Sequence, residues 1–161
     1  MASPEDSIHR DDQARTALAL LRITLGAMFV WVFFENLGKG LYTPQGYAGL
    51  INVYADRGMA PEFWKGVMRV VASQAAIMAP VQAASEIGFG VALVLGLLTP
   101  VIALSSFVFL TSLWVSEWGT AWIWELLVPM AVALCLAIGR AGRTWGVDAV
   151  LRRRFPRGLL W

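Results

Sequence analysis

The stretch that decides the fold is Glu86-Ile-Gly-Phe-Gly-Val-Ala-Leu-Val-Leu-Gly-Leu-Leu-Thr-Pro100, an apolar run that opens with a carboxylate. Small residues recur at every fourth position and form one stripe on such a helix: Ala84, Gly88, Ala92 and Gly96. A stripe of this kind lets a neighbouring membrane helix approach closely. Glu86 lies on another face of the same helix. The run therefore predicts the central helix of a small membrane bundle, packed on both sides.

The composition supports an all-α integral membrane protein of one domain. Of 161 residues, 58% are hydrophobic and 15% are charged, and the mean hydropathy is +0.62. A soluble domain of this length needs a more polar surface, so we expect the lipid bilayer to surround most of the chain. One cysteine and one histidine exclude an internal disulfide and bis-histidine haem. No metal-ligand spacing occurs, and we expect neither a metal nor a nucleic acid as a partner.

Four apolar segments predict a four-helix transmembrane bundle within residues 17–139. Each is 16 to 18 residues long, which at 1.5 Å per residue approaches the thickness of the hydrocarbon core. The segments are 17–34, 81–98, 101–116 and 122–139, and Thr99-Pro100 is expected to close the second. Residues 1–16 form a polar N-terminal tail, and residues 140–161 form a basic C-terminal segment.

Residues 36–79 are expected to form the first outer loop and to contain an amphipathic helix. From Pro61 onward, apolar residues such as Phe63 and Val67 fall on one side and charged residues such as Arg69 on the other. This pattern is typical of a helix that lies on the membrane surface. The alternative is that 62–79 forms the outer part of a long second span, kinked at Pro80.

The positive charges predict the orientation. The C-terminal segment carries six arginines and the N-terminal tail adds Arg10 and Arg15, whereas the predicted outer loops carry few cations. Because cytoplasmic loops are enriched in Lys and Arg, both termini should lie in the cytoplasm, which requires an even number of spans. We expect a multi-pass protein of a bacterial cytoplasmic (inner) membrane.

The charges near the outer ends of the spans are the candidate site. Four carboxylates gather there: Glu35, Glu86, Glu117 and Glu125. A charge well inside a span costs about 2.5–3.5 kcal/mol on insertion scales, so Glu86 needs a partner. Lys39 is the nearest cation in depth and Arg69 the second. Arg22 lies near the inner end of its span, so a direct pair with Glu86 needs tilt or a water-filled cavity.

Two interpretations of Glu86 stay open at this point. It is either a buried carboxyl that fixes helix register, or a proton acceptor that works with Lys39 in a cavity open to the outer face. Burial in an apolar site favours the neutral form of a carboxyl, which suits proton uptake and release in quinone chemistry. The candidate substrate-binding residues around it are Arg22, Glu35, Arg69 and Glu125.

Three segments together resemble the DoxX-like membrane proteins. They are Leu21-Arg-Ile-Thr-Leu-Gly-Ala-Met-Phe29 followed by Leu37-Gly-Lys39, the Glu86 helix with Gly96-Leu-Leu-Thr99, and Gly139-Arg-Ala-Gly-Arg-Thr-Trp-Gly-Val-Asp148. The resemblance covers most of residues 18–150 and implies a four-helix membrane protein. Its motif positions fall on Arg22, Lys39, Glu86, Arg143 and Asp148. We expect the last two to form a structural ion pair under the bundle.

The family includes the small, DoxD-type subunit of thiosulfate:quinone oxidoreductase. The resemblance therefore implies a membrane subunit of a redox complex that feeds electrons to the quinone pool, with thiosulfate as a candidate donor. The chain has no redox group of its own, so it is at most one subunit of such an enzyme, with quinone as its ligand and protein partners beside it. The alternative is a non-enzymatic assembly or anchoring subunit that holds its partner through residues 36–79. A third interpretation is a small-solute or lipid transporter, which needs a homo-oligomer to form a pathway.

Overall fold

The regular elements of the protein are all helices. The computed structural model describes residues 4–156 and 158, and within these it contains no strand. The order is α1 (Pro4–Gly38), α2 (Pro44–Arg57), α3 (Glu62–Ser73), α4 (Ala75–Leu95), α5 (Thr99–Ser116), α6 (Ile123–Gly139), the 3₁₀ helix η1 (Ala141–Arg143) and α7 (Val147–Arg154). The predicted all-α class is confirmed. The ends of the two predicted terminal segments, residues 1–3, 157 and 159–161, lie outside the described residues.

Three helices of the described chain are long and apolar enough to cross a membrane. They are residues Asp12–Gly38 of α1, the whole of α4 and the whole of α5. They correspond to three of the four predicted spans. The fourth, α6, is apolar but has only 17 residues, or about 26 Å. Its crossing of the membrane stays a prediction, as do the even number of spans and the cytoplasmic side of both termini.

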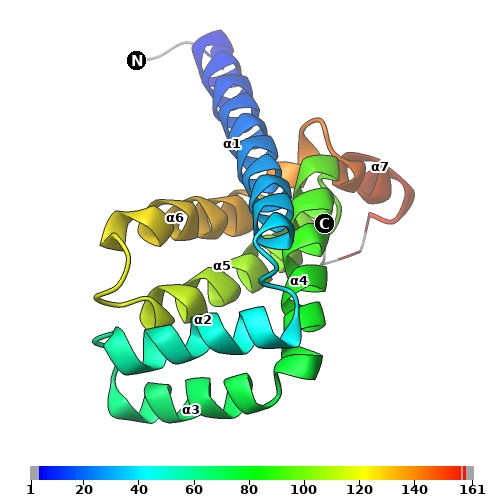
Figure 1. Cartoon of the computed structure of the whole chain (residues 1–161). Coiled ribbons are helices and arrows are strands. Elements are labelled where there is room, and N and C mark those ends of the chain that lie inside the picture. The colour runs from blue at the N-terminus through cyan, green and yellow to red at the C-terminus, as the bar shows by residue number, and fades with distance from the viewer. Residues whose placement is uncertain (1–3, 157, 159–161) are drawn as a thin grey trace.

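The helices pack as two pairs, α1 with α4 and α5 with α6, while α2 and α3 lie side by side across the lower end in Figure 1. The α1–α4 crossing depends on two glycines. A Cβ atom at Gly26 would lie 2.8 Å from the Gly90 carbonyl oxygen, and one at Gly90 would lie 2.7 Å from Val30 Cγ2. The two backbones therefore touch directly at this point.

The close approach uses a different face of α4 from the predicted one. Ala84 and Gly88 of the predicted small-residue stripe are exposed, whereas Glu86, Gly90 and Leu93 are buried. The stripe prediction was wrong because small residues permit close packing but do not require it. A carboxylate facing lipid is costly, so the face that carries Glu86 turns inward.

The boundaries of α4 also differ from the prediction. The helix begins at Ala75, directly after the break at Gln74, and ends at Leu95 with Gly96 in the left-handed conformation (φ +66°). Thr99 and Pro100 begin α5 instead of closing the second span, in keeping with the preference of proline for the first helical turn. The predicted 62–79 helix is thus divided between α3 and α4, and neither of the two alternatives describes it fully.

Helix α2 lies in the part of the predicted outer loop, before Pro61, for which no helix was predicted. Its start is fixed by Thr43, whose Oγ1 accepts a hydrogen bond from the Gly46 amide at 3.1 Å, and by Pro44 in the first turn. Tyr47, Ile51 and Ala55 are buried at fourfold spacing. The Thr-Pro cap and this spacing were readable in the sequence and outweigh the two helical glycines.

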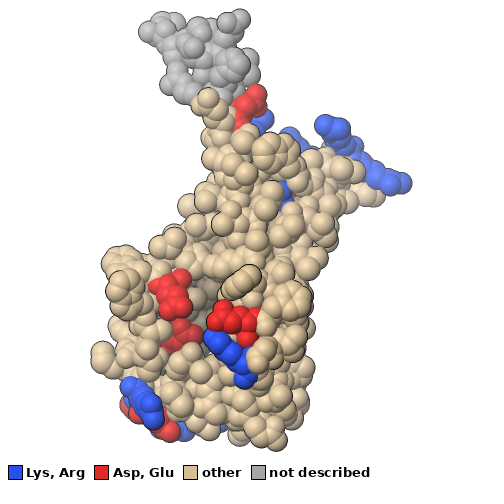
Figure 2. Space-filling view, turned by 45° about the horizontal axis from the view of Figure 1, so that its top comes forward, with Lys and Arg blue, Asp and Glu red and all other residues tan. Residues whose placement is uncertain are grey.

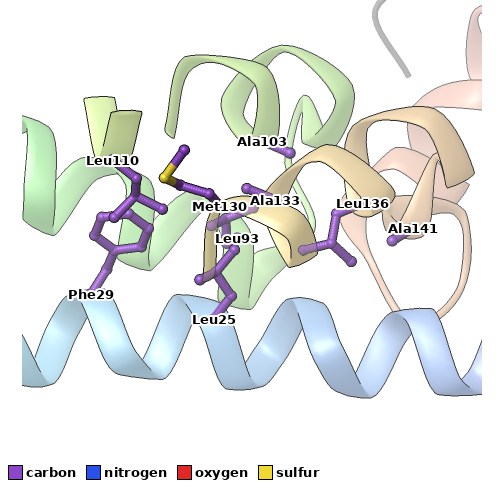
Figure 3. Packing of buried hydrophobic residues seen from close by; sticks show 9 residues of the cluster. All are labelled: Leu25, Phe29, Leu93, Ala103, Leu110, Met130, Ala133, Leu136 and Ala141. Carbon is purple, nitrogen blue, oxygen red and sulfur yellow. The ribbon is translucent and has the colours of Figure 1, made fainter. Parts of the chain in front are cut away.

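The main core lies where the two helix pairs meet. Leu25 and Phe29 of α1 point toward Leu93 of α4 and Met130 of α6 (Figure 3). A second cluster joins α2, α3 and the start of α4: Tyr47, Ile51, Ala55, Ala60, Met68, Ala72, Ala75 and Ala79. The α2–α3 pair is therefore a packed layer over one end of the bundle, and it covers the region around Glu86.

Candidate functional site

Glu86 is buried and hydrogen-bonded by neutral side chains. Only 1% of the Glu86 surface is exposed. Gln82 Nε2 donates to Oε1 at 2.9 Å, Asn36 Nδ2 donates to Oε2 at 3.1 Å, and the Tyr42 hydroxyl donates to Oε2. The prediction that this acid is sheltered inside the bundle is confirmed. Glu86 is the twelfth residue of α4, whereas it would be the sixth residue of a span that starts at Val81. It therefore lies farther from the start of its helix than predicted.

Three different elements supply the donors. Gln82 lies one turn before Glu86 on α4, so the helix itself aligns the two side chains. Asn36 lies in the last turn of α1. Tyr42 lies in the tight link after α1, where Gly40 adopts φ +69° and the Leu41 amide donates to the Asn36 carbonyl at 3.0 Å. The Tyr42 ring stacks on Phe33 with centroids 5.4 Å apart, which fixes its hydroxyl toward the carboxylate.

The predicted cationic partners lie elsewhere. Lys39 Nζ is 2.6 Å from Glu35 Oε1, one turn back on α1, and both side chains are about half exposed. Arg69 NH2 lies 4.0 Å from Asp56 Oδ1 on the surface of the α2–α3 layer. No ion pair among the described residues includes Glu86. The predictions of a Glu86–Lys39 or Glu86–Arg69 pair were therefore wrong.

Neutral donors give this site a chemistry that an ion pair lacks. A carboxylate offers about four acceptor positions, and three of them are used. If the acid takes up a proton, the Tyr42 hydroxyl can rotate and accept from it, and the two amides can turn their oxygens toward it. Burial raises the pKa of Tyr42, and its hydrogen bond to Glu86 adds to the effect, so the tyrosine keeps its own proton while it shares this contact.

A cleft of about 260 Å³ lies beside Glu86, between the α2–α3 layer and the α4–α5 hairpin. Its walls are mainly apolar, with Met68, Val71 and Leu113 among them. Its polar lining residues are Tyr47, Gln82, Ser85, Ser112 and Ser116. Gln82 thus lines the cleft and donates to Glu86, so one amide connects the buried acid to a space that a ligand can enter.

A second tyrosine–carboxylate pair lies at the rim of the same end. The Tyr54 hydroxyl of α2 donates to Glu117 Oε1 at 3.2 Å. Burial raises the pKa of Glu117; the Tyr54 hydrogen bond opposes this, and the charge of Glu125 adds to it. Burial likewise raises the pKa of Tyr54, with the charge of Glu117 as the next cause. Figure 2 shows acidic groups set around a hollow on one face, separated by a nearly uncharged surface from basic groups at the other end.

The α2–α3 layer is attached to this rim by three polar contacts. Besides the Tyr54–Glu117 bond, Trp64 Nε1 donates to Ser116 Oγ at 2.9 Å, and the Met59 amide donates to the Trp118 carbonyl at 2.6 Å. The layer therefore forms one wall of the cleft and is held in place from α5 and its following turn.

Arg22 lies at the other end of α4 and is completely buried. NH1 donates to the carbonyls of Leu93 (2.7 Å) and Val94 (3.1 Å), and NH2 donates to those of Thr144 (3.3 Å) and Trp145 (3.1 Å). The last carbonyls of a helix have no partner within it and carry its partial negative charge. Arg22 meets this need and ties α1 to α4 and to the C-terminal segment. The structure does not bring it to Glu86.

Asp148 caps α5 from a distance in sequence. Its Oδ1 accepts from the Leu98 amide at 2.7 Å and its Oδ2 from the Thr99 amide at 2.8 Å, while its own amide donates to the Gly96 carbonyl at 2.9 Å. The charge of Asp148 also acts on Arg143, and the ion pair between the two stays a prediction. Asp148 attaches the C-terminal segment to α5 through this backbone cap, since the start of α5 lacks a capping side chain of its own.

Sequence reasoning missed the three donors to Glu86. Gln82 was within reach of it, because positions four apart share a helix face. Asn36 and Tyr42 depend on how the link after α1 folds back, which local patterns do not encode. Of the other predicted binding residues, Glu35 pairs with Lys39, and Glu125 is exposed but close enough for its charge to act on Glu117.

A family model described as DoxX matches residues 17–117. This is more than half of the chain; it includes Arg22, Lys39 and Glu86 and ends before Arg143 and Asp148. No curated protein matches the chain, and no solved structure does.

Proposed function

We propose that this chain, which belongs to the DoxX family, is a membrane subunit that binds a quinone head group in the cleft beside Glu86. In this role it works with a partner protein that supplies the electrons. Thiosulfate is the candidate source of those electrons because of the family resemblance. The site itself supports only the quinone side of the reaction.

The observation that carries the proposal is the double position of Gln82. It lines a mostly apolar cleft of about 260 Å³ and also donates to the buried carboxyl of Glu86 at 2.9 Å. Small-molecule sites are typically apolar pockets with few polar groups. Methionine, valine and leucine side chains suit a quinone ring and the start of its tail. Ser112 also lines the cleft, and its hydroxyl donates to the Phe109 carbonyl at 2.7 Å, so its oxygen is left as an acceptor.

The chain's own contribution is the handling of protons. Reduction of a quinone to a quinol takes two electrons and two protons. Glu86 can hold one of these two protons at a carboxyl oxygen, because its neighbours are donors that can also act as acceptors. Gln82 separates Glu86 from the cleft, so this proton reaches the quinone when the Gln82 side chain turns aside, and the second proton comes from water in the open cleft. Tyr42 lies in the link after α1, is half-buried and donates to Glu86, so it can give its hydroxyl proton to Glu86 while it takes up another from the surface. The electrons come from the partner, since the sequence holds no redox group.

Filling the cleft tests this proposal. Ser112→Phe places a ring in the cleft, whereas Ser105→Phe adds the same ring on the exposed side of the same helix. We expect Ser112→Phe to weaken binding of a short-chain quinone to the purified chain at least tenfold, about 1.4 kcal/mol, and Ser105→Phe to leave it unchanged. Equal binding by the two variants contradicts the assignment of the cleft.

The outer face of α3 supports the second candidate, an anchoring subunit. Helix α3 packs on the rest of the protein through Trp64, Met68 and Ala72, and exposes Phe63 (73%) and Val70 (64%). If a partner docks here, Phe63→Ser with Val70→Ser should release it while Glu86→Gln should retain it. Loss of quinone-linked activity in Glu86→Gln with the partner still bound favours the first candidate. Unchanged activity in that variant favours the second.

A further inference from the structure

A basic cavity of about 210 Å³ lies at the end of the molecule opposite the Glu86 site. Four elements each bring one arginine to it. They are Arg15 from α1, Arg140 directly after α6, Arg143 from η1 and Arg152 from α7. An adjoining hollow of about 310 Å³ shares Arg143 and Arg152 and adds Arg153. Figure 2 shows basic groups gathered toward this end. Arginines distant in sequence are thus assembled by the fold into one concave site.

Among the described side chains, two acidic residues lie close to this cluster. Asp12 lies 3.9 Å from Arg15, and both side chains are largely exposed. Asp148 is buried, and its two oxygens accept from the Leu98 and Thr99 amides. Burial lowers the pKa of Arg143, the charges of Arg152 and Arg140 lower it further, and Asp148 opposes them. The arginines therefore act on one another as like charges across the cavity.

The backbone at Arg140 gives an independent reason to look here. Arg140 adopts φ +48° directly after α6, in the left-handed region that favours glycine. Glycine is the commonest residue at this position of a helix end, so an arginine there is strained. Its side chain lines the cavity.

The position of the cavity indicates a lipid as its occupant. Leu18 and Gly139 form its apolar part, and the helices that leave it expose Leu21 (43%) and Ile138 (76%) within two turns. A phosphate held among the arginines would thus lie where apolar helix surface begins. Guanidinium groups bind phosphate oxygens in pairs, and basic pockets between membrane helices suit anionic lipid head groups.

We infer that this arginine-lined cavity binds the phosphate of an anionic phospholipid, whose acyl chains follow the exposed apolar surface of α1 and α6. The inference is independent of the proposed quinone site, which lies at the other end of α4. The lipid phosphate would offset part of the positive charge of the cluster and hold α1, α6 and α7 together.

The test is titration of the purified full chain with phosphatidylglycerol, phosphatidylcholine and inorganic phosphate, followed by native mass spectrometry. The variant is Arg140→Gly with Arg152→Gln. Glycine is favoured at position 140, so the fold should persist and the melting temperature without lipid should not fall. The matched control is Arg57→Gln with Arg154→Gln, which removes two exposed arginines that do not line the cavity.

We expect phosphatidylglycerol to bind more tightly than phosphatidylcholine. Binding should weaken about 30-fold in the cavity variant, since each basic residue near an anionic lipid contributes about a factor of five, and less than twofold in the control. Equal binding of the two lipids overturns the inference, and so does an equal loss in both variants. If an equal concentration of inorganic phosphate displaces phosphatidylglycerol, the cavity is a site for a free anion, and the inference that it binds a lipid is overturned.

Discussion

Two buried ionisable side chains contact or belong to α4, Arg22 from α1 and Glu86 from α4 itself, and their surroundings differ in kind. Arg22 meets the end of the helix and donates to four backbone carbonyls. Glu86 lies in the middle and accepts from three side chains. Backbone carbonyls cannot change from acceptors to donors, whereas a hydroxyl and two amides can do both by rotation. Arg22 thus has partners that can only accept, whereas the partners of Glu86 can accept or donate, as the proposed proton transfer requires.

The largest effect should come from removing the fixed contact. In Arg22→Leu the carbonyls of Val94, Thr144 and Trp145 lose the guanidinium as donor, and the Leu93 carbonyl keeps only the Gly96 amide at 3.1 Å. An unsatisfied buried polar group costs about 1–3 kcal/mol, so we expect a loss of at least 4 kcal/mol in the free energy of unfolding, or no folded protein. Denaturant titration in detergent measures it. Arg22→Lys is the control for charge, and stability equal to the parent in Arg22→Leu would contradict the role of this contact.

The next effect concerns the helix crossing that brings Glu86 inward. Gly90→Ala places a methyl group 2.7–3.0 Å from Val30 and Gly26, and overpacking of this kind costs about 1–3 kcal/mol. Gly88→Ala meets nothing within 4 Å and should be neutral or slightly stabilising. Thermal unfolding of the two variants compares the faces of α4 directly. If Gly88→Ala is the more damaging, the helix is turned the other way.

A smaller effect is expected at the second tyrosine–carboxylate pair. Tyr54→Phe removes one hydrogen bond to Glu117 and should cost about 0.5–1.5 kcal/mol at neutral pH. The pKa of Glu117 is higher in the folded protein than in the unfolded chain. Between these two pKa values the folded protein binds more protons, so the free energy of unfolding falls as the pH rises from the lower pKa to the higher one. Because the tyrosine opposes the rise, its loss should steepen this fall. Melting temperatures measured at several pH values for the parent and Tyr54→Phe give the pH dependence of stability. Tyr42→Phe, measured in the same way, provides the comparison with the first tyrosine–carboxylate pair.

The sequence was sufficient for the parts of the fold that depend on composition. A helical membrane protein, three of its spans and the shelter of Glu86 all follow from apolar run lengths and the cost of a charge in lipid. The packing face of α4 was mispredicted because the small-residue stripe with Gly88 was given more weight than the face that Gly90 shares with Glu86, and the contact of Gly90 with Gly26 is visible only in the structure. Lys39 does not pair with Glu86, because it forms an ion pair with Glu35 one helical turn away.

The site depended on tertiary structure in the same way. Asn36 and Tyr42 reach Glu86 only because the link after α1 turns back, and Asp148 reaches α5 across fifty residues of sequence. Charge counting assumed that a buried acid needs a cation. Three neutral donors provide another solution.

The most direct test of the account is quinone-coupled turnover of Glu86→Gln beside Glu35→Gln, in the native membrane complex. The amides of Gln82 and Asn36 can turn their oxygens toward the new side chain, so the melting temperature should change little, at a cost of about 1 kcal/mol or less. Turnover should fall at least tenfold, about 1.4 kcal/mol in the barrier, because the amide cannot carry the proton. Glu35→Gln should keep full turnover. Unchanged turnover in Glu86→Gln, or a fall that merely follows the loss of folded protein, would contradict the claim that Glu86 exchanges a proton.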